Sequence, residues 1–394
     1  MQDISKNNRI NNVHEIPVLN GFRALFILLV ANFHIWQQSW LQPAVNIFGR
    51  YYSFDYLARA GYVFVDGMIL LSALLMFLPY ARHIIYGSPL PSLKHYYIKR
   101  FARIAPSYYF SVLLILFLFV LPQERYFGYE HLLVKDLLYH VFFIHTFDLH
   151  TYIGTKLNVV LWTVAILIQG YILMPIIIKG LLKKPFIVGV FMLMVAFGFR
   201  YYAMPRDDIN MLLNQLPAFF DVYLFGFGIC FALVYIQKAG IEQRLRLWHR
   251  ACFTVLFILS IIAISKLLYF QASSTREMLS INQLRTRFFF AIAFSIAILS
   301  AELSLKFVIY LLNNKFIRFL SEISYNMYIW HQFLAVEMRM AFLNTEQLHA
   351  DVGLQRAYTL LCWSVAFIVA MFCTYYIEKP CAKAIVNKYL RSKE

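Results

Sequence analysis

The feature that most constrains this chain is a series of apolar runs, each about as long as a bilayer-spanning helix. The first covers Val18 to Gln37, about 30 Å of helix, which matches the hydrocarbon core of a membrane. Of the 394 residues, 61% are hydrophobic and only 14% are charged, whereas about a quarter of a soluble protein is charged. Run length and composition together predict a polytopic membrane protein.

We predict an all-α protein of about ten transmembrane helices. Their expected positions are Val18–Gln37, Tyr62–Tyr80, Ser107–Leu121, Asn158–Ile178, Phe186–Tyr202, Leu216–Ile236, Ala251–Phe270, Phe288–Leu303, Glu322–Phe342 and Ala357–Ile377. Lys and Arg gather between alternate runs, and the positive-inside rule then places both termini in the cytoplasm. The run Asp136–Thr146 is too short to span, so we expect an outer or re-entrant segment there.

The expected domains follow from these spans: a cytoplasmic tail over residues 1–17, a transmembrane domain over 18–380 and a basic cytoplasmic tail over 381–394. The net charge of +16 does not indicate a nucleic-acid partner, because the basic residues are divided among the ends of the spans. The five cysteines have no paired spacing, and no metal site is expected.

The first span carries two ionisable residues, Arg23 and His34. Eleven residues of helix return to nearly the same face, about 16 Å further along the axis. Ionisable side chains at membrane depth are costly, and they usually face a protein interior or a wet cavity where they serve function. We therefore expect the chemistry of the protein near this pair.

The second span carries Asp66 and, further along, Ser72. A carboxylate at that depth needs a partner or a proton. Two interpretations remain open: a functional carboxylate, or a polar contact that locks helices together.

The segment after the second span is strongly basic, with Lys99, Arg100 and Arg103 close together. On a helix, Arg100 and Arg103 project side by side, and two guanidinium groups make a good clamp for phosphate. The alternative is a simple positive-inside anchor.

Near the C-terminus, Ser324, Tyr328 and His331 recur at spacings of four and three residues, which places a hydroxyl, a phenol and an imidazole on one helix face. Helix–helix hydrogen bonding would explain such a face equally well. In the fourth span, Trp162 and Tyr171 are further amphipathic residues.

Five segments together resemble the acyltransferase-3 family of transmembrane O-acyltransferases. They are LNGFRALFILLVANFH, GYVFVDGMILLSALL, YYIKRFARIAPSYYF, SEISYNMYIWHQF and YYIEKP. They keep the family's order from Leu19 to Pro380. Each segment alone is a weak signal, but five in order are specific.

The resemblance implies transfer of an acyl group, with acetyl expected, from acetyl-CoA or another acyl-CoA to a hydroxyl of a glycan or lipid-linked sugar. The expected partners are this acceptor and membrane lipid, without a metal, and the expected location is a bacterial inner membrane. Arg100 and Arg103, with Lys99, would hold the coenzyme A phosphates. Ser72, Trp162, Tyr171, Ser324, Tyr328 and His331 would line the substrate pocket.

Histidine is the side chain best suited to deprotonate an acceptor hydroxyl near neutral pH. We therefore assign His34 as general base or transient acyl carrier, and Asp66 as the residue that orients it. Arg23 would stabilise developing negative charge.

Two positions depart from the family's pattern: Leu167 stands where an acidic residue is usual, and Ala73 replaces a glycine. Two alternatives to an active enzyme therefore stay open. One is a transporter or flippase, in which the buried charges line a substrate path. The other is a catalytically impaired relative that acts as a sensor.

Overall fold

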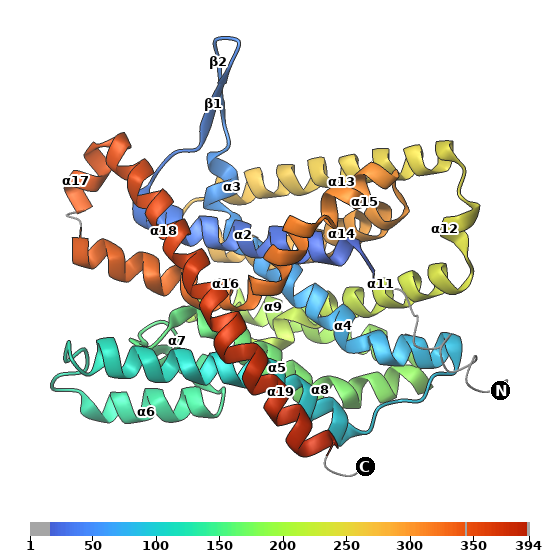
Figure 1. The fold of residues 1–394 in the computed structure, drawn as a ribbon, viewed down its shortest axis with the longest axis horizontal. Helices are drawn as coiled ribbons and strands as arrows, with labels where there is room; N and C mark the ends of the chain where they lie inside the picture. Colours follow the sequence, from blue (N-terminus) through green and yellow to red (C-terminus); the bar gives the residue numbers. More distant parts are fainter. Residues whose placement is uncertain (1–15, 343–344, 392–394) are drawn as a thin grey trace.

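The structure is a computed structural model that describes residues 16–342 and 345–391. Its main elements are long helices, most of which run side by side (Figure 1). The ten long helices of the described chain are α2 Val18–Ser39, α4 Phe64–Tyr86, α5 Leu93–Ile115, α8 Trp162–Lys183, α9 Pro185–Ala203, α11 Phe220–Lys238, α13 Leu247–Ala272, α14 Leu279–Leu303, α16 Lys315–Phe342 and α18 Val352–Phe372.

Short elements connect and extend these helices. The short helices are α3 Asp55–Arg59, α6 Glu130–Val141, α7 Leu149–Tyr152, α10 Ile209–Leu212, α12 Ile241–Arg244, α15 Lys306–Leu312, α17 Thr345–Ala350 and α19 Lys379–Val386. Tighter or wider turns of helix cover Gly61–Val63, Leu116–Val120, His145–Phe147, Val159–Leu161, Leu216–Phe219, Cys373–Glu378 and Asn387–Arg391. Strands β1 Ala44–Ile47 and β2 Arg50–Ser53 form one antiparallel hairpin, which protrudes from the bundle in Figure 1.

The fold confirms the prediction of an all-α polytopic membrane protein. Each of the ten predicted spans falls on one of the ten long helices. Among the described residues, nine helical segments are long and apolar enough to cross a membrane. The helix outside that set is α16, whose 28 residues include charged positions at both ends, such as Lys315, Arg318 and Arg339.

Several helices begin earlier than predicted, and α5 shows the largest difference. Helix α5 starts at Leu93 rather than Ser107, and the Ser92 side chain caps it by accepting a hydrogen bond from the backbone N–H of His95 at 3.2 Å. Arg100 and Arg103 therefore lie on the helix itself, not in an inner loop. The hydropathy pattern missed this extension because the charged first turns of a helix lie outside its apolar stretch.

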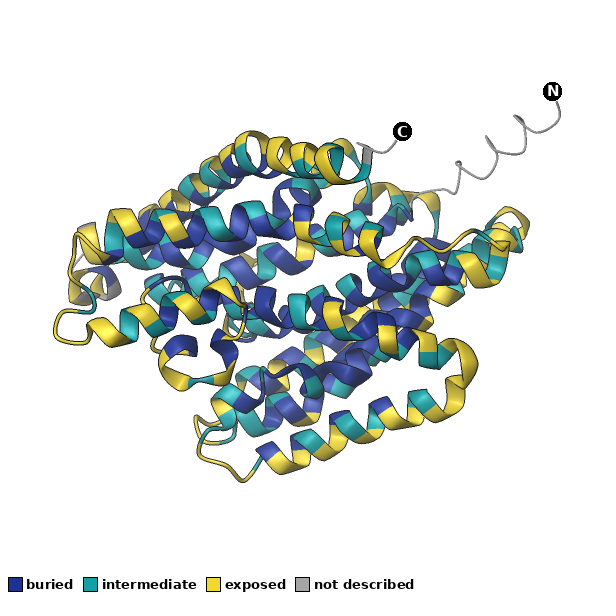
Figure 2. Cartoon of the chain, turned by 90° about the horizontal axis from the view of Figure 1, so that it is seen from below, coloured by how far each residue is buried: buried dark blue, intermediate teal, exposed yellow. Residues whose placement is uncertain are grey.

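The outward faces of the bundle are apolar, as contact with lipid requires. Figure 2 shows buried residues along the inner faces of the helices and exposed residues along the outer ones. In α13, for example, Leu256, Ile258 and Leu259 are exposed. Helix α6 is too short to cross the membrane, since its 12 residues extend only about 18 Å, short of the roughly 30 Å bilayer core.

Helices α2, α4, α5, α8 and α16 surround the region where the candidate site lies. Close approach of α11 holds α4 in place, because Gly226 of α11 lies against the Leu70 carbonyl and the Ala73 side chain. A Cβ atom at Gly226 would stand 2.7 Å from both, so the close packing of these helices depends on this glycine.

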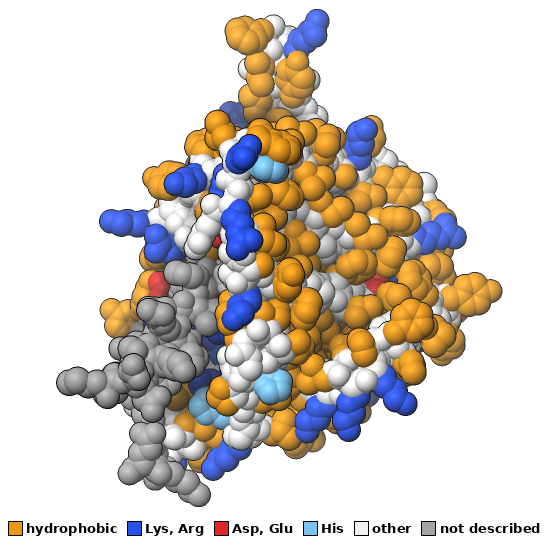
Figure 3. All heavy atoms as spheres, turned by 90° about the vertical axis from the view of Figure 1, so that its right-hand side faces the viewer, with side chains coloured by type: hydrophobic (Ala, Val, Ile, Leu, Met, Phe, Trp, Pro, Cys, Tyr) orange, Lys and Arg blue, Asp and Glu red, His pale blue; other side chains and the backbone are white. Residues whose placement is uncertain are grey.

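One end of the bundle is basic. The face in Figure 3, which is the right-hand end of Figure 1, carries many Lys and Arg side chains and few Asp and Glu. The start of α5, the end of α8 and the start of α16 all lie at this end.

Candidate active site

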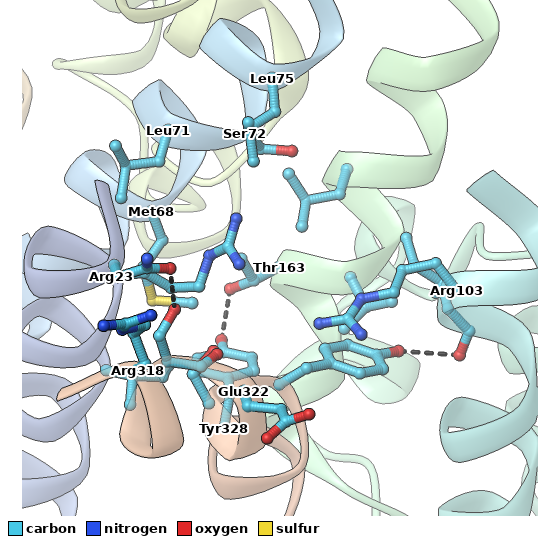
Figure 4. Close-up of a pocket in the computed structure, with 18 of the residues that line it drawn as sticks. Arg23, Met68, Leu71, Ser72, Leu75, Arg103, Thr163, Arg318, Glu322 and Tyr328 are labelled. Carbon is cyan, nitrogen blue, oxygen red and sulfur yellow. Dashed lines mark hydrogen bonds between the residues drawn. The ribbon is translucent and has the colours of Figure 1, made fainter. Parts of the chain in front are cut away.

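A cavity of about 880 Å³ lies between α2, α4, α5, α8 and α16. Its walls include seven of the residues predicted from sequence: Arg23, Ser72, Arg100, Arg103, Tyr171, Ser324 and Tyr328. Figure 4 shows Leu71, Ser72 and Leu75 of α4 on one side and Arg318, Glu322 and Tyr328 of α16 on the other. Five helices that are far apart in sequence thus bring the predicted residues to one place.

Arg23 extends into the middle of the cavity (Figure 4). Among the residues that the structure describes, its guanidinium has no hydrogen-bond or ion-pair partner. The neighbouring charges at this position are the cations Arg100 and Arg103, which repel it, and Glu378. A cation held at membrane depth without a partner is costly, so the cavity favours an anionic ligand.

Unlike Arg23, Arg100 and Arg103 each have a hydrogen-bond or ion-pair partner within the protein. The Nη2 atom of Arg100 donates a hydrogen bond to the Leu75 carbonyl oxygen at 2.9 Å, and its guanidinium lies 5.1 Å from the ring centroid of Tyr171. Arg103 forms an ion pair with Glu378. Both arginines are thereby held with part of their hydrogen-bonding capacity still free for a ligand.

Glu378 is a buried residue. Its second carboxylate oxygen accepts a hydrogen bond from Asn326 Nδ2 at 2.7 Å. Asn326 in turn donates to Thr374 Oγ1 at 3.0 Å. Glu378 therefore joins Arg103 to α16 and to the final helical segment.

Two pairs of hydroxyl groups cross the cavity wall. Ser72 of α4 is hydrogen-bonded to the Tyr171 hydroxyl of α8 at 2.9 Å. Thr163 of α8 is hydrogen-bonded to the Tyr328 hydroxyl of α16 at 2.5 Å, and Tyr328 also reaches the Val160 carbonyl at 2.9 Å. These contacts fix three cavity helices relative to one another, and each hydroxyl has a partner within the protein.

The two predicted histidines lie next to each other but outside the cavity wall. The ring centroids of His34 and His331 are 5.1 Å apart, and His331 lies 5.6 Å from the ring of Tyr328. The Nδ1 atom of His331 contacts the carbonyl oxygens of Tyr328 at 2.7 Å and Met327 at 3.1 Å. Carbonyl oxygens only accept, so the proton of neutral His331 is on Nδ1 and Nε2 carries the lone pair.

His331 Nε2 has no hydrogen-bond partner among the described residues. His34 Nδ1 contacts Gln37 Oε1 at 3.0 Å. The histidine pair thus lies about one helical turn beyond Tyr328, at the end of the cavity away from the basic face.

Asp66 is engaged elsewhere, and this differs from the role we expected for it beside His34. Its Oδ2 atom accepts a hydrogen bond from Arg287 Nε at 3.1 Å, with both side chains buried. Arg287 also donates to the Leu213 carbonyl at 2.7 Å. A buried carboxylate is best satisfied by a guanidinium, and no pattern in the sequence indicates which arginine would approach it.

Lys99 and Trp162 do not contribute to the cavity wall. Lys99 is exposed, and Trp162 packs against Tyr152 at a ring-centroid distance of 6.3 Å. In the part of the chain described, no cluster of His, Cys, Asp and Glu could hold a metal ion.

Two cations at the cavity mouth, Lys315 and Arg318, were not predicted from the sequence. They lie on the exposed first turns of α16. Their spacing with Glu322 and Tyr325 places all four on one face of a helix, which was the available signal. This spacing was not recognised because the span was expected to begin at Glu322.

Leu167 lines the cavity at the position where the family pattern has an acidic residue. Among the described lining residues, Glu322 is the one carboxylate, and it is paired with Lys379 and accepts a hydrogen bond from the Tyr375 hydroxyl at 2.9 Å. The carboxylate missing at Leu167 is therefore not replaced by a free one on this wall.

Comparison with known proteins identifies a relative and a family for this chain. The chain is similar to a putative acetyltransferase, ORF330, of Acidianus two-tailed virus, with 24% identity over 247 residues. The matched region covers 61% of this chain and 64% of that relative. No solved structure matches the chain. The sequence pattern of the family described as "Acyltransferase domain" matches residues 16–378. The chain therefore belongs to this family, acyltransferase-3.

Proposed function

We propose that this protein is a membrane-embedded O-acyltransferase that moves an acyl group from a coenzyme A thioester to a hydroxyl of a glycan or lipid-linked sugar. The observation that carries the proposal is the unpartnered Arg23 guanidinium beside Arg100 and Arg103 in one cavity. Membership of the acyltransferase-3 family supports the reaction class.

The cations of the cavity suit the phosphate groups of coenzyme A. Arg100 and Arg103 lie on α5 near the basic end of the bundle, with Lys315 and Arg318 at the start of α16. Guanidinium groups bind phosphate through paired hydrogen bonds, whereas lysine acts as a point charge. The donor would therefore enter at the basic end, which the positive-inside rule places in the cytoplasm.

The thioester carbonyl would then lie near Arg23, deeper in the cavity. Negative charge develops on the carbonyl oxygen when the acceptor hydroxyl attacks, and a guanidinium in a water-poor site stabilises it strongly. Because Arg23 has no protein counter-ion in the described chain, it needs no rearrangement to take this role.

The His34–His331 pair would supply the base. The Nε2 lone pair of His331 and the ring of His34 lie just beyond Tyr328. The imidazole takes the proton of the acceptor hydroxyl while the oxygen bonds to the acyl carbon. The carbon–sulfur bond then breaks, and the proton passes to the departing thiolate as free coenzyme A.

The proposal places the protein in a bacterial cytoplasmic membrane with both termini in the cytoplasm. The test is mass spectrometry of surface glycans from cells that lack the gene, complemented with the native chain or with His34→Ala. We expect an acyl-sized mass to vanish on deletion and to return with the native chain alone. Restoration by His34→Ala would overturn the role of His34, and unchanged glycans in every fraction would count against a glycan acceptor.

Donor turnover separates an enzyme from a transporter. Purified native protein should release free coenzyme A in step with acceptor modification, and a transporter would not. A parallel His331→Ala variant tests whether the second imidazole shares the proton transfer.

A further inference from the structure

The donor cavity is divided into a charged part and an apolar part. The cations Arg100, Arg103, Lys315 and Arg318 belong to the helix turns nearest the basic end of the bundle. The apolar residues come from α2, α4 and α8: Ile27, Met68, Leu71, Val164 and Leu167. Leu75 also lines the cavity but lies beside the cations, since its carbonyl oxygen accepts the Arg100 hydrogen bond. Arg23 lies one helical turn before Ile27 and so marks the boundary between the parts.

Polar groups in the apolar part are already satisfied. Thr163 and Tyr328 are hydrogen-bonded to each other at 2.5 Å, and Ser72 and Tyr171 at 2.9 Å. A ligand therefore gains little by offering these hydroxyls a hydrogen bond, since the existing ones would have to break. Beyond Arg23, the wall therefore offers a ligand mainly hydrocarbon surface.

Leu167 is central to this apolar wall. It lies four residues after Thr163 and four before Tyr171, so all three project from the same face of α8 toward the cavity. An acidic side chain at this position would place a charge between the two hydroxyl pairs. Leucine instead adds an apolar side chain to the cavity that Leu71 of α4 also lines.

We propose that the preferred donor carries an acyl chain longer than acetyl, with the chain packed against Leu167, Leu71 and Met68. This inference rests on the proposed function and names the acyl group that the same site takes. An acetyl group offers only one methyl to this wall. Each buried methylene contributes about 0.8 kcal/mol, or about fourfold in affinity at room temperature.

The test measures binding of donors to the purified, full-length protein by the ligand-induced rise in melting temperature. The probes are coenzyme A, acetyl-CoA, butanoyl-CoA, hexanoyl-CoA and octanoyl-CoA. We expect affinity to increase about fourfold per methylene until the chain fills the apolar part. Equal affinity for acetyl-CoA and every longer thioester would overturn the inference, with the pantetheine arm then occupying this wall.

Substitutions on the wall sharpen the result. Leu167→Glu should weaken hexanoyl-CoA at least tenfold while affinity for free coenzyme A changes little, because the carboxylate must be desolvated beside the chain. Leu71→Phe reduces the space and should shift the optimum to a shorter chain, and it serves if Leu167→Glu fails to fold. Ile176 of α8 is exposed and lies outside the cavity, so Ile176→Ala is the matched control.

Failure of this inference is distinguishable from failure of the proposed function. If coenzyme A binds but chain length has no effect, the inference falls and the acyltransferase proposal stands. If neither coenzyme A nor any thioester raises the melting temperature, the donor site itself is wrong. If Leu167→Glu keeps the native chain preference, Leu167 does not form the acyl wall.

Discussion

Two arginines within the helix bundle, Arg23 and Arg287, differ in what surrounds them. Arg287 is fully buried, donates to Asp66 at 3.1 Å and to the Leu213 carbonyl at 2.7 Å, and lies 4.0 Å from the ring centroid of Phe219. Arg23 opens into the cavity and has no partner in the described chain. A charge whose partners are built into the protein holds helices together, whereas one without partners is available for a ligand.

A second buried arginine also forms an ion pair with a buried aspartate, as Arg287 does with Asp66. Arg200 of α9 donates to Asp221 of α11 at 2.5 Å and to the Ala218 carbonyl at 2.8 Å, and both charged side chains are buried. The Arg200–Asp221 and Arg287–Asp66 pairs are close enough to influence each other electrostatically. We interpret this cluster as structural and the cavity cations as functional.

The largest expected effect is on folding. Arg287→Met leaves the Asp66 carboxylate buried without its partner, and breaking such a pair costs about 3–5 kcal/mol. The free energy of unfolding, measured on purified protein, should fall by that amount. In the double variant Asp66→Asn/Arg287→Met no buried charge remains, so most of the loss should be recovered. A single variant as stable as the native chain would contradict the structural interpretation.

The second-largest expected effect is a loss of activity with no loss of stability. Arg23→Gln should lower acyl transfer by about 10²–10³, the typical loss when one oxyanion-stabilising group is removed. Its melting temperature should equal or exceed the native value, since an unpaired cation is removed. The measurement is release of free coenzyme A with acceptor present. A large loss of stability in this variant would show that Arg23 has a structural partner.

A third, smaller effect concerns Arg103, which is intermediate between the fully buried, paired Arg287 and the unpartnered Arg23. Arg103 is paired with buried Glu378, but its own side chain is 46% exposed. Glu378→Gln should therefore weaken donor binding by only about fivefold, roughly 1 kcal/mol, because solvent screens an exposed partner. The melting-temperature shift with coenzyme A measures this, and complete loss of the shift would place Glu378 directly in the site.

The smallest effect tests a buried group in the region between α5 and α8. Burial first, and then neighbouring His140, hold the pKa of His145 well below its usual range. Below pH 6.5 the unfolded chain binds a proton that folded His145 does not, so stability falls as the pH drops, by about 1 kcal/mol from pH 6.5 to 5.5. His145→Phe should show a shallower loss of melting temperature over this interval. An unchanged pH profile would rule out this contribution of His145.

The sequence predicted much of the cavity because its residues obey helical periodicity. Ser324 and Tyr328 are one turn apart on α16, and Arg100 and Arg103 one turn apart on α5, so each pair reaches the same wall. The apolar runs likewise located the long helices.

Pairing between helices could not be predicted, because periodicity says nothing about which helix lies opposite. Asp66 and Arg287 are 221 residues apart, and Arg287 stood just outside the predicted span. Arg103 and Glu378, 275 residues apart, were missed for the same reason. His34 was expected in the site with Arg23, but the cavity ends before the histidine pair, a boundary set by packing across helices.

The most direct test of the account measures two properties of the native chain and of Arg23→Gln: the release of free coenzyme A from the acyl donor with acceptor present, and coenzyme A binding by the ligand-induced rise in melting temperature. We expect coenzyme A to raise the melting temperature of both proteins, because Arg100 and Arg103 remain to hold its phosphates, and only the native chain to transfer the acyl group at a substantial rate. Lys99→Gln, an exposed residue outside the cavity, should keep the native response. If Arg23→Gln transfers the acyl group as fast as the native chain, the unpartnered arginine does not stabilise the developing charge and the account is wrong.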